Sequence, residues 1–161
     1  MTAAPDEDLR TVRHLLEDAH VAMLTSIAPD GTLMSRPMGM QAVDFDGDLW
    51  FFAERSSRLV AHVTVHPQVN VAVAAGSSWV SLTGRARVVE DDAKKRQLWN
   101  AVVEAWLPQG PDDPEAVLLH VAADSAEYWD SPGRVATLIS FVKAKVTGER
   151  YDGGENERVE L

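Results

Sequence analysis

The segment LWFFAERSSR, residues 49–58, decides the fold and the function expected of this chain. Its first half is an apolar run directly after the turn sequence Asp46-Gly47-Asp48, which indicates a strand entered from a hairpin. Its second half, Ser56-Ser57-Arg58, opens a stretch that Pro67 terminates, which indicates a short helix. Backbone N–H groups at a helix start attract anions, and Ser and Arg donate hydrogen bonds to phosphate. Two interpretations remain open: a phosphate site, or an ordinary helix cap with solvated arginines.

Short strands separated by turns surround this segment. The pattern predicts strands at 21–27, 33–43, 49–53, 69–75, 80–88, 117–123 and 126–129. It predicts helices at about 6–19, 58–66, 91–107 and 135–146, and a polar tail at about 148–161 that is extended or frayed. Six or seven short strands with hairpin turns predict a mostly β fold, an antiparallel barrel with peripheral helices, in a single domain spanning 1–161.

Composition excludes several classes of function. The 161 residues contain no Cys, which excludes disulfides, thiolate nucleophiles and Cys-ligated metal centres. The net charge of −10 disfavours nucleic-acid binding, and no run approaches the ~18 apolar residues of a membrane span. We therefore expect a cytoplasmic protein. Residues 32–87 hold five Arg against four acidic residues, so a small anion would be drawn to this segment.

Other residues allow more than one interpretation. Pro37 interrupts a predicted strand, which indicates an edge, a bulge or an interrupted pairing that frees backbone groups for a ligand. Trp99 and Trp106 would share one face of the predicted helix, either in the core or as an aromatic lid. His62 and His66 have i, i+4 spacing without the acidic residue of an HExxH motif, so no metal site is expected.

Several of these motifs, in this order, resemble one branch of a known family. They are Arg36-Pro37-Met38, LWFFAERSSR, WVSLTGRARVVED, LWNAVVEAWLPQGPDDPE, AEYWDSP and the closing GENERVEL. Together they cover nearly all of residues 8–161 and resemble the general stress protein 26 branch of the pyridoxamine 5′-phosphate oxidase-like proteins. The resemblance implies a split β-barrel that binds FMN, or FAD in some relatives, at a homodimer interface.

The resemblance also implies roles for individual residues. Those along the flavin ring and ribityl chain would be Arg36, Pro37 and Met38, with Phe51, Phe52 and Ala53 as the adjoining strand wall. The residues holding the phosphate would be Ser56, Ser57 and Arg58, where relatives often have Lys in place of Arg58. Trp106 and Trp129 would approach the ring from the facing subunit.

Three functions are compatible with the resemblance. The first is an FMN-dependent oxidoreductase linked to stress, using a nicotinamide or another small electron donor; no residue stands out as a catalytic acid or base. The second is a non-catalytic flavin-binding or redox-sensing dimer. The third is a relative that binds a tetrapyrrole or deazaflavin on the same barrel. Oxidation of pyridoxamine phosphate itself is not what the resemblance implies, because the true oxidases have additional C-terminal basic residues for the substrate phosphate, whereas GENERVEL offers a single Arg among acidic residues.

Overall fold

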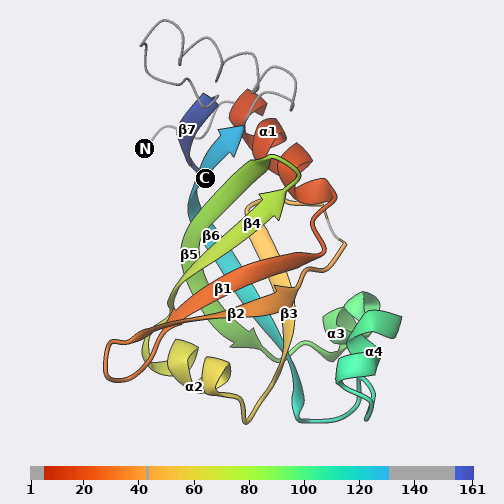
Figure 1. Ribbon diagram of the computed structural model, residues 1–161. Helices are drawn as coiled ribbons and strands as arrows, with labels where there is room; N and C mark the ends of the chain where they lie inside the picture. Colours follow the sequence, from red (N-terminus) through yellow and green to blue (C-terminus); the bar gives the residue numbers. More distant parts are fainter. Residues whose placement is uncertain (1–5, 43, 131–154) are drawn as a thin grey trace, which may run out of the picture.

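The computed structural model describes residues 6–42, 44–130 and 155–161 (Figure 1). Its helices are α1 (Asp6–Glu17), α2 (Arg58–Val65), α3 (Asp92–Leu98) and α4 (Ala101–Trp106). Its strands are β1 (Val21–Ile27), β2 (Leu33–Gly39), β3 (Asp48–Glu54), β4 (Gln68–Ala75), β5 (Ser78–Val89), β6 (Ala116–Asp130) and β7 (Glu155–Glu160). None of the described helices is long and apolar enough to span a membrane.

The strands form one antiparallel sheet that curls into an incompletely closed barrel. Hydrogen bonds connect them in the order β2-β1-β4-β5-β6-β3, and β7 pairs with the later half of β6. The two end strands, β2 and β3, lie next to each other with no hydrogen-bonded register between them in the described residues (Figure 1). We call this opening between β2 and β3 the seam. The fold is the expected split β-barrel.

Alternation of side chains along each strand builds the core. Strand residues point to opposite faces in turn, so every second residue enters the barrel. Leu24 of β1, Val71 of β4, Leu82 of β5 and Leu119 of β6 are fully or almost fully buried in this way. Helix α1 packs its apolar stripe, including Val12, on one end of the barrel, and α2 lies at the other end (Figure 1).

The two longest strands show why one sequence prediction was wrong. Residues 117–123 and 126–129 belong to a single strand, β6, rather than two. The polar pair Asp124-Ser125 interrupts the apolar pattern, but a register shift absorbs it: Thr83 pairs with Ser125, whereas Gly84 pairs with Ala123. The backbone approaches so closely here that a Cβ on Gly84 would overlap the carbonyl group of Ala122.

The helix predicted at 91–107 is two helices. Trp99 has extended backbone angles (φ −63°, ψ 134°) and ends α3. The side-chain Oδ1 of Asn100 then accepts hydrogen bonds from the N–H groups of Val102 and Val103, which starts α4. Trp99 and Trp106 therefore do not share one helical face.

Two further boundaries differ from the expectation or fall outside the structure. Strand β2 ends at Gly39 instead of Val43. The helix predicted at 135–146 lies outside the described residues. Within the predicted tail, residues 155–160 are extended and pair with β6 as β7.

Candidate functional site at the seam

Pro37 lies on an edge strand, in agreement with the first of its predicted explanations. It is opposite Met23 of β1, and β2 has no hydrogen-bonded neighbour on its other side in the described residues. A residue without an N–H group is tolerated at such an edge. Met34, Arg36 and Met38 form the half-buried face of β2, so the strand directs a guanidinium toward the barrel between two thioethers.

Arg36 is held by a chain of hydrogen bonds from three elements. Its Nη1 donates to Ser26 Oγ of β1 at 2.9 Å. Ser26 Oγ lies 2.9 Å from His62 Nδ1 of α2. Ser26 is fully buried and His62 almost so, at 4% exposure. The sequence analysis missed both as site residues. Ser26 follows Ala22 and Leu24 on the inward face of β1, and this break in an apolar pattern was the available signal.

The start of α2 has the predicted helix cap and an adjacent cation. Ser57 Oγ accepts a hydrogen bond from the N–H of Val60 at 3.3 Å, so this hydroxyl caps the helix. The N–H of Ser56 donates to Glu115 Oε2 at 3.3 Å. The Arg58 side chain is exposed and makes no hydrogen bond or ion pair within the described part of the chain.

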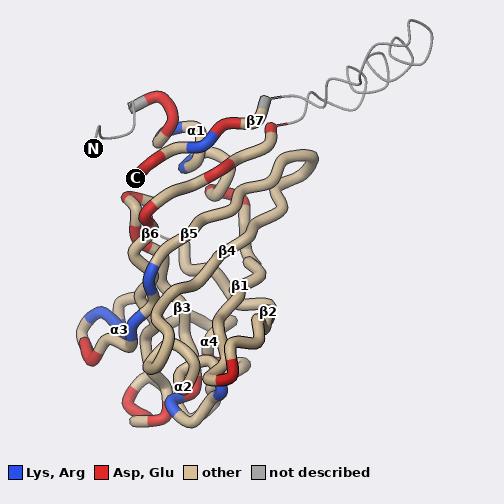
Figure 2. Tube along the Cα trace, turned by 90° about the vertical axis from the view of Figure 1, so that its left-hand side faces the viewer, with Lys and Arg blue, Asp and Glu red and all other residues tan. Residues whose placement is uncertain are grey.

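Arg36 and Arg58 are close enough to influence each other. Burial lowers the pKa of Arg36 below its usual value, and the positive charge of Arg58 lowers this pKa further. Neither guanidinium is paired with a carboxylate of the described residues, whereas Arg55 pairs with Glu90 at 2.7 Å. Figure 2 shows Lys and Arg positions around α2 together with Asp and Glu positions, while Asp and Glu predominate at the α1 end. Within the described residues, the charges of Arg36 and Arg58 are therefore not compensated by an ion pair.

The predicted aromatic wall is divided between the two faces of β3. Phe51 and Ala53 are buried and belong to the main core cluster. Phe52 is on the opposite face, half-buried, with its ring 5.3 Å from the ring of Trp99 in an edge-to-face arrangement. Of the three predicted wall residues, Phe52 alone points away from the core.

The two tryptophans expected from a facing subunit are both exposed. Trp106 is 81% exposed on α4, and Trp129 is 36% exposed near the end of β6, where it pairs in register with Trp79 of β5. Figure 1 shows the end of β6 at the α1 side of the barrel, far from α2. Trp129 and the start of α2 thus lie at opposite ends of the barrel.

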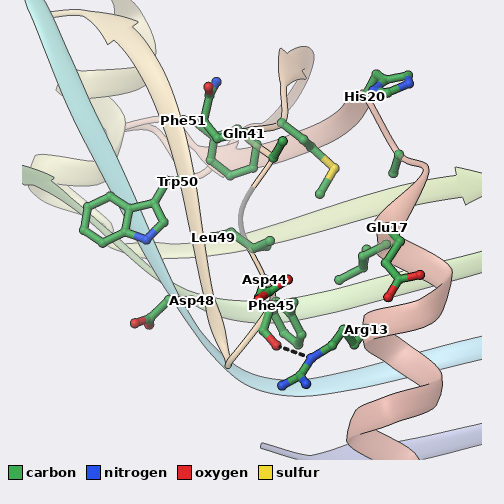
Figure 3. Close-up of a pocket in the computed structure, with 14 residues that line it drawn as sticks. Arg13, Glu17, His20, Gln41, Asp44, Phe45, Asp48, Leu49, Trp50 and Phe51 are labelled. Atoms are coloured by element: carbon green, nitrogen blue, oxygen red, sulfur yellow. Dashed lines mark hydrogen bonds between the residues drawn. The ribbon is translucent and has the colours of Figure 1, made fainter. Parts of the chain in front are cut away.

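A cavity of about 280 Å³ opens at the other end of the seam, where β2 ends and β3 begins. Figure 3 shows Arg13 and Glu17 of α1 facing Asp44 and Phe45 of the β2–β3 loop across it. Arg13 Nε donates to the carbonyl of Phe45 at 2.9 Å. Sequence reasoning missed these residues because they come from segments about 30 positions apart.

A second buried histidine borders the start of β3. His120 Nε2 lies 2.8 Å from Asp48 Oδ1, and its ring centroid is 4.6 Å from that of Trp50. No group of His, Asp and Glu in the described ranges has the arrangement of a metal site. The described side chains at the seam offer guanidiniums, hydroxyls and an aromatic ring for binding.

Comparisons with known proteins agree with this geometry. A family profile described as "pyridoxamine 5′-phosphate oxidase like" matches residues 7–152. The chain is 25% identical over 139 residues to protein bli-3 of Neurospora crassa, and the match covers 79% of this chain and 66% of that protein. The chain thus spans about two thirds of the length of this curated relative.

Several solved structures are similar to this chain in both fold and sequence. A general stress protein 26 from Jannaschia sp. CCS1 superimposes with a TM-score of 0.76 at 28% identity, covering 96% of this chain and 99% of that one. The general stress FMN/FAD binding protein of Xanthomonas citri has a TM-score of 0.68 at 29% identity, covering 80% and 93%. A general stress family protein of Xanthomonas campestris pv. campestris has a TM-score of 0.68 at 31% identity, covering 82% and 92%. From its split barrel and the extent of the profile match, this chain belongs to the pyridoxamine 5′-phosphate oxidase-like family.

Proposed function

We propose that the chain is a single flavin-binding domain that takes FMN at the seam, with its phosphate between Arg36 and Arg58. The observation that carries this proposal is the pair of guanidiniums, one half-buried, with no carboxylate partner in the described residues. Holding two positive charges together is unfavourable unless an anion joins them. The first N–H groups of α2 have no acceptor inside the helix and add to the attraction for phosphate.

The other seam residues suit a flavin as well. Ser57 fixes the start of α2, and Ser56 presents an exposed hydroxyl beside it. Pro37, Met38 and Phe52 offer apolar and aromatic surface, as an isoalloxazine requires. FAD, with its additional nucleotide, is the alternative cofactor, and the X. citri relative is described as binding FMN or FAD.

We propose further that the protein acts as a homodimer with the flavin at the subunit interface. Val21 and Met23 of β1 and Trp79 of β5 are 57%, 43% and 49% exposed, which is unusual for large apolar residues on a sheet. Trp106 is still more exposed, as expected for a side chain that meets a ligand of the facing subunit. Bound flavin would supply the redox chemistry, and the chain would bind, orient and shield it.

The most direct test is the absorption spectrum of the purified protein, followed by identification of any cofactor released on denaturation and by the molar mass in solution. The proposal predicts flavin bands, released FMN and a dimer. Protein that stays colourless and does not bind added FMN would contradict it.

Catalysis is a separate question that the same sample answers. If the protein is an oxidoreductase, NADH or NADPH should bleach the bound flavin under anaerobic conditions, and an electron acceptor should reoxidise it. The alternative, a redox-sensing flavin binder, predicts no turnover but a change in dimer stability on flavin reduction. The side chains around Arg36 and Arg58 favour this alternative, because arginines and serines supply hydrogen-bond donors there without an evident catalytic acid.

A further inference from the structure

We propose that Ser26 and His62 are positioning residues: together they hold the Arg36 guanidinium in place without neutralising its charge, so that it stays available to a phosphate group. The identity of the ligand rests on the proposed function above. The positioning itself rests on the hydrogen bonds, burial and charges of three residues from β1, β2 and α2.

The contacts form a continuous chain. Arg36 Nη1 and Ser26 Oγ are 2.9 Å apart, as are Ser26 Oγ and His62 Nδ1. Both distances are ordinary hydrogen bonds. Ser26 has no exposed surface and His62 only 4%, so water does not compete for Ser26. A buried chain of this kind is stronger than the same contacts in water.

The chemistry of the guanidinium fixes the direction of the first step of the chain. A guanidinium can only donate, so Ser26 Oγ accepts from Arg36. A serine hydroxyl has one proton, and His62 Nδ1 lies within hydrogen-bond distance of it. In the proposed arrangement Ser26 donates this proton to Nδ1, so the ring proton of His62 is on Nε2.

The neutrality of this anchor distinguishes Arg36 from Arg55 and Arg96. Arg55 is bonded to Glu90 and Arg96 to Asp112, both at 2.7 Å, so each of these charges is largely cancelled. A carboxylate in place of Ser26 would hold Arg36 equally well but would repel a phosphate. A hydroxyl backed by a neutral imidazole holds the guanidinium and leaves its charge for the ligand.

The first test needs no cofactor. Long-range ¹H–¹⁵N correlation of the full chain at neutral pH reports the tautomer of each histidine. We expect His62 to show an unprotonated Nδ1 and a protonated Nε2, and we expect the Nδ1 signal to move in Ser26→Ala. A protonated Nδ1 in the wild type would overturn the proposed direction of the chain, whatever the protein binds.

The second test separates positioning from a merely structural role. FMN and riboflavin differ only in the phosphate, so fluorescence titration with both isolates the contribution of the phosphate. For Ser26→Ala and His62→Leu we expect FMN affinity to fall about tenfold while riboflavin affinity stays within about twofold. His62→Gln, which keeps an acceptor, should restore most of the preference for FMN. Equal losses for both ligands would overturn the proposal.

A matched control comes from the opposite side of the barrel. Ser78 is also a buried serine, 6% exposed, and its hydroxyl bonds to Asp130 at 2.6 Å. Ser78→Ala should leave the ratio of the two affinities unchanged, and a change as large as that of Ser26→Ala would contradict a specific role for Ser26.

If the wild type binds neither ligand, the proposed function fails, while the tautomer of His62 still decides the positioning claim.

Discussion

The seam and the opposite wall of the barrel, formed by β5 and β6, are built on contrasting principles. In the wall, β5 and β6 pair over the whole of Ser78–Val89, and each also pairs with a second strand. At the seam, β2 pairs with β1 and β3 with β6, and the facing edges are not hydrogen-bonded to each other in the described residues. In the wall, strand pairing satisfies the backbone hydrogen bonds. At the seam, side chains such as Arg36 are available to bind another molecule.

Stability and binding are therefore located in different parts of the barrel. Close backbone packing tolerates little change, as at Gly84, while an unpaired edge tolerates Pro37 and an inward-facing cation. Mutations in the wall should therefore act on the free energy of unfolding, and mutations at the seam on ligand affinity.

The largest effect is expected for Gly84→Ala in the wall. The new Cβ would overlap the backbone carbonyl of Ala122, which cannot move without breaking the β5–β6 register. We expect a loss of about 3 kcal/mol or more in the free energy of unfolding, measured with urea. The matched change at the seam is Gly39→Ala, where nothing lies within 4 Å of the added atom. It should change stability by at most about 1 kcal/mol, and equal costs at the two glycines would remove the contrast.

The next effect belongs to the arginines of the seam. Arg58→Ala, and separately Arg36→Ala, should weaken FMN binding by about 1.5–3 kcal/mol, roughly 10- to 150-fold, because each removes a hydrogen bond to a charged group. Isothermal titration measures this directly. Arg96→Ala is the control, since Arg96 is already paired with Asp112 on the surface. An FMN dissociation constant unaffected by both seam variants would mean that the phosphate binds elsewhere.

A smaller effect is expected where α3 and α4 meet beside the seam. Asn100 caps α4 through Oδ1, and its Nδ2 donates to Gln41 Oε1 in the loop after β2 at 3.0 Å. Asn100→Ala should cost about 0.5–2 kcal/mol of unfolding free energy through the lost cap. Asn100→Asp keeps the acceptor and should recover most of that loss in the same urea titration. If the two variants are equally destabilised, the cap does not start α4.

The smallest effect lies in the β1–β2 turn and depends on pH. The backbone N–H of Thr32 bonds to Asp30 and lowers the pKa of this carboxyl below its usual 3.8. Since the pKa is lower in the folded state, the stabilisation is complete above about pH 4 and is lost as the pH falls through the lowered pKa. The difference in unfolding midpoint between wild type and Asp30→Ala should shrink between pH 6 and pH 3. A difference that grows on acidification would contradict this assignment.

Local patterns in the sequence predicted most of the fold. Alternation along 21–27 and 80–88 predicted strands with one buried face, and the turns at Gly31 and Gly47 contain glycines with positive φ (87° and 108°), as such turns require. The helix break at Trp99 and the continuity of β6 were missed, because a side-chain cap and a register shift override the local periodicity.

The site was predicted less completely, for a related reason. Arg58 and the capping Ser57 follow from the start of a helix, and Pro37 from its missing N–H group. The partners of Arg36 do not follow, since Ser26 and His62 are 36 positions apart and meet only when α2 packs on β1. The cavity residues Arg13 and Phe45 are likewise brought together by tertiary packing alone.

The central claim is that the seam binds the phosphate of a flavin. Its most direct test is a pair of titrations of cofactor-free wild-type protein, one with FMN and one with riboflavin. FMN should bind at least about tenfold more tightly than riboflavin, as two arginines on one phosphate require. Equal affinities, or no binding of either ligand, would contradict it.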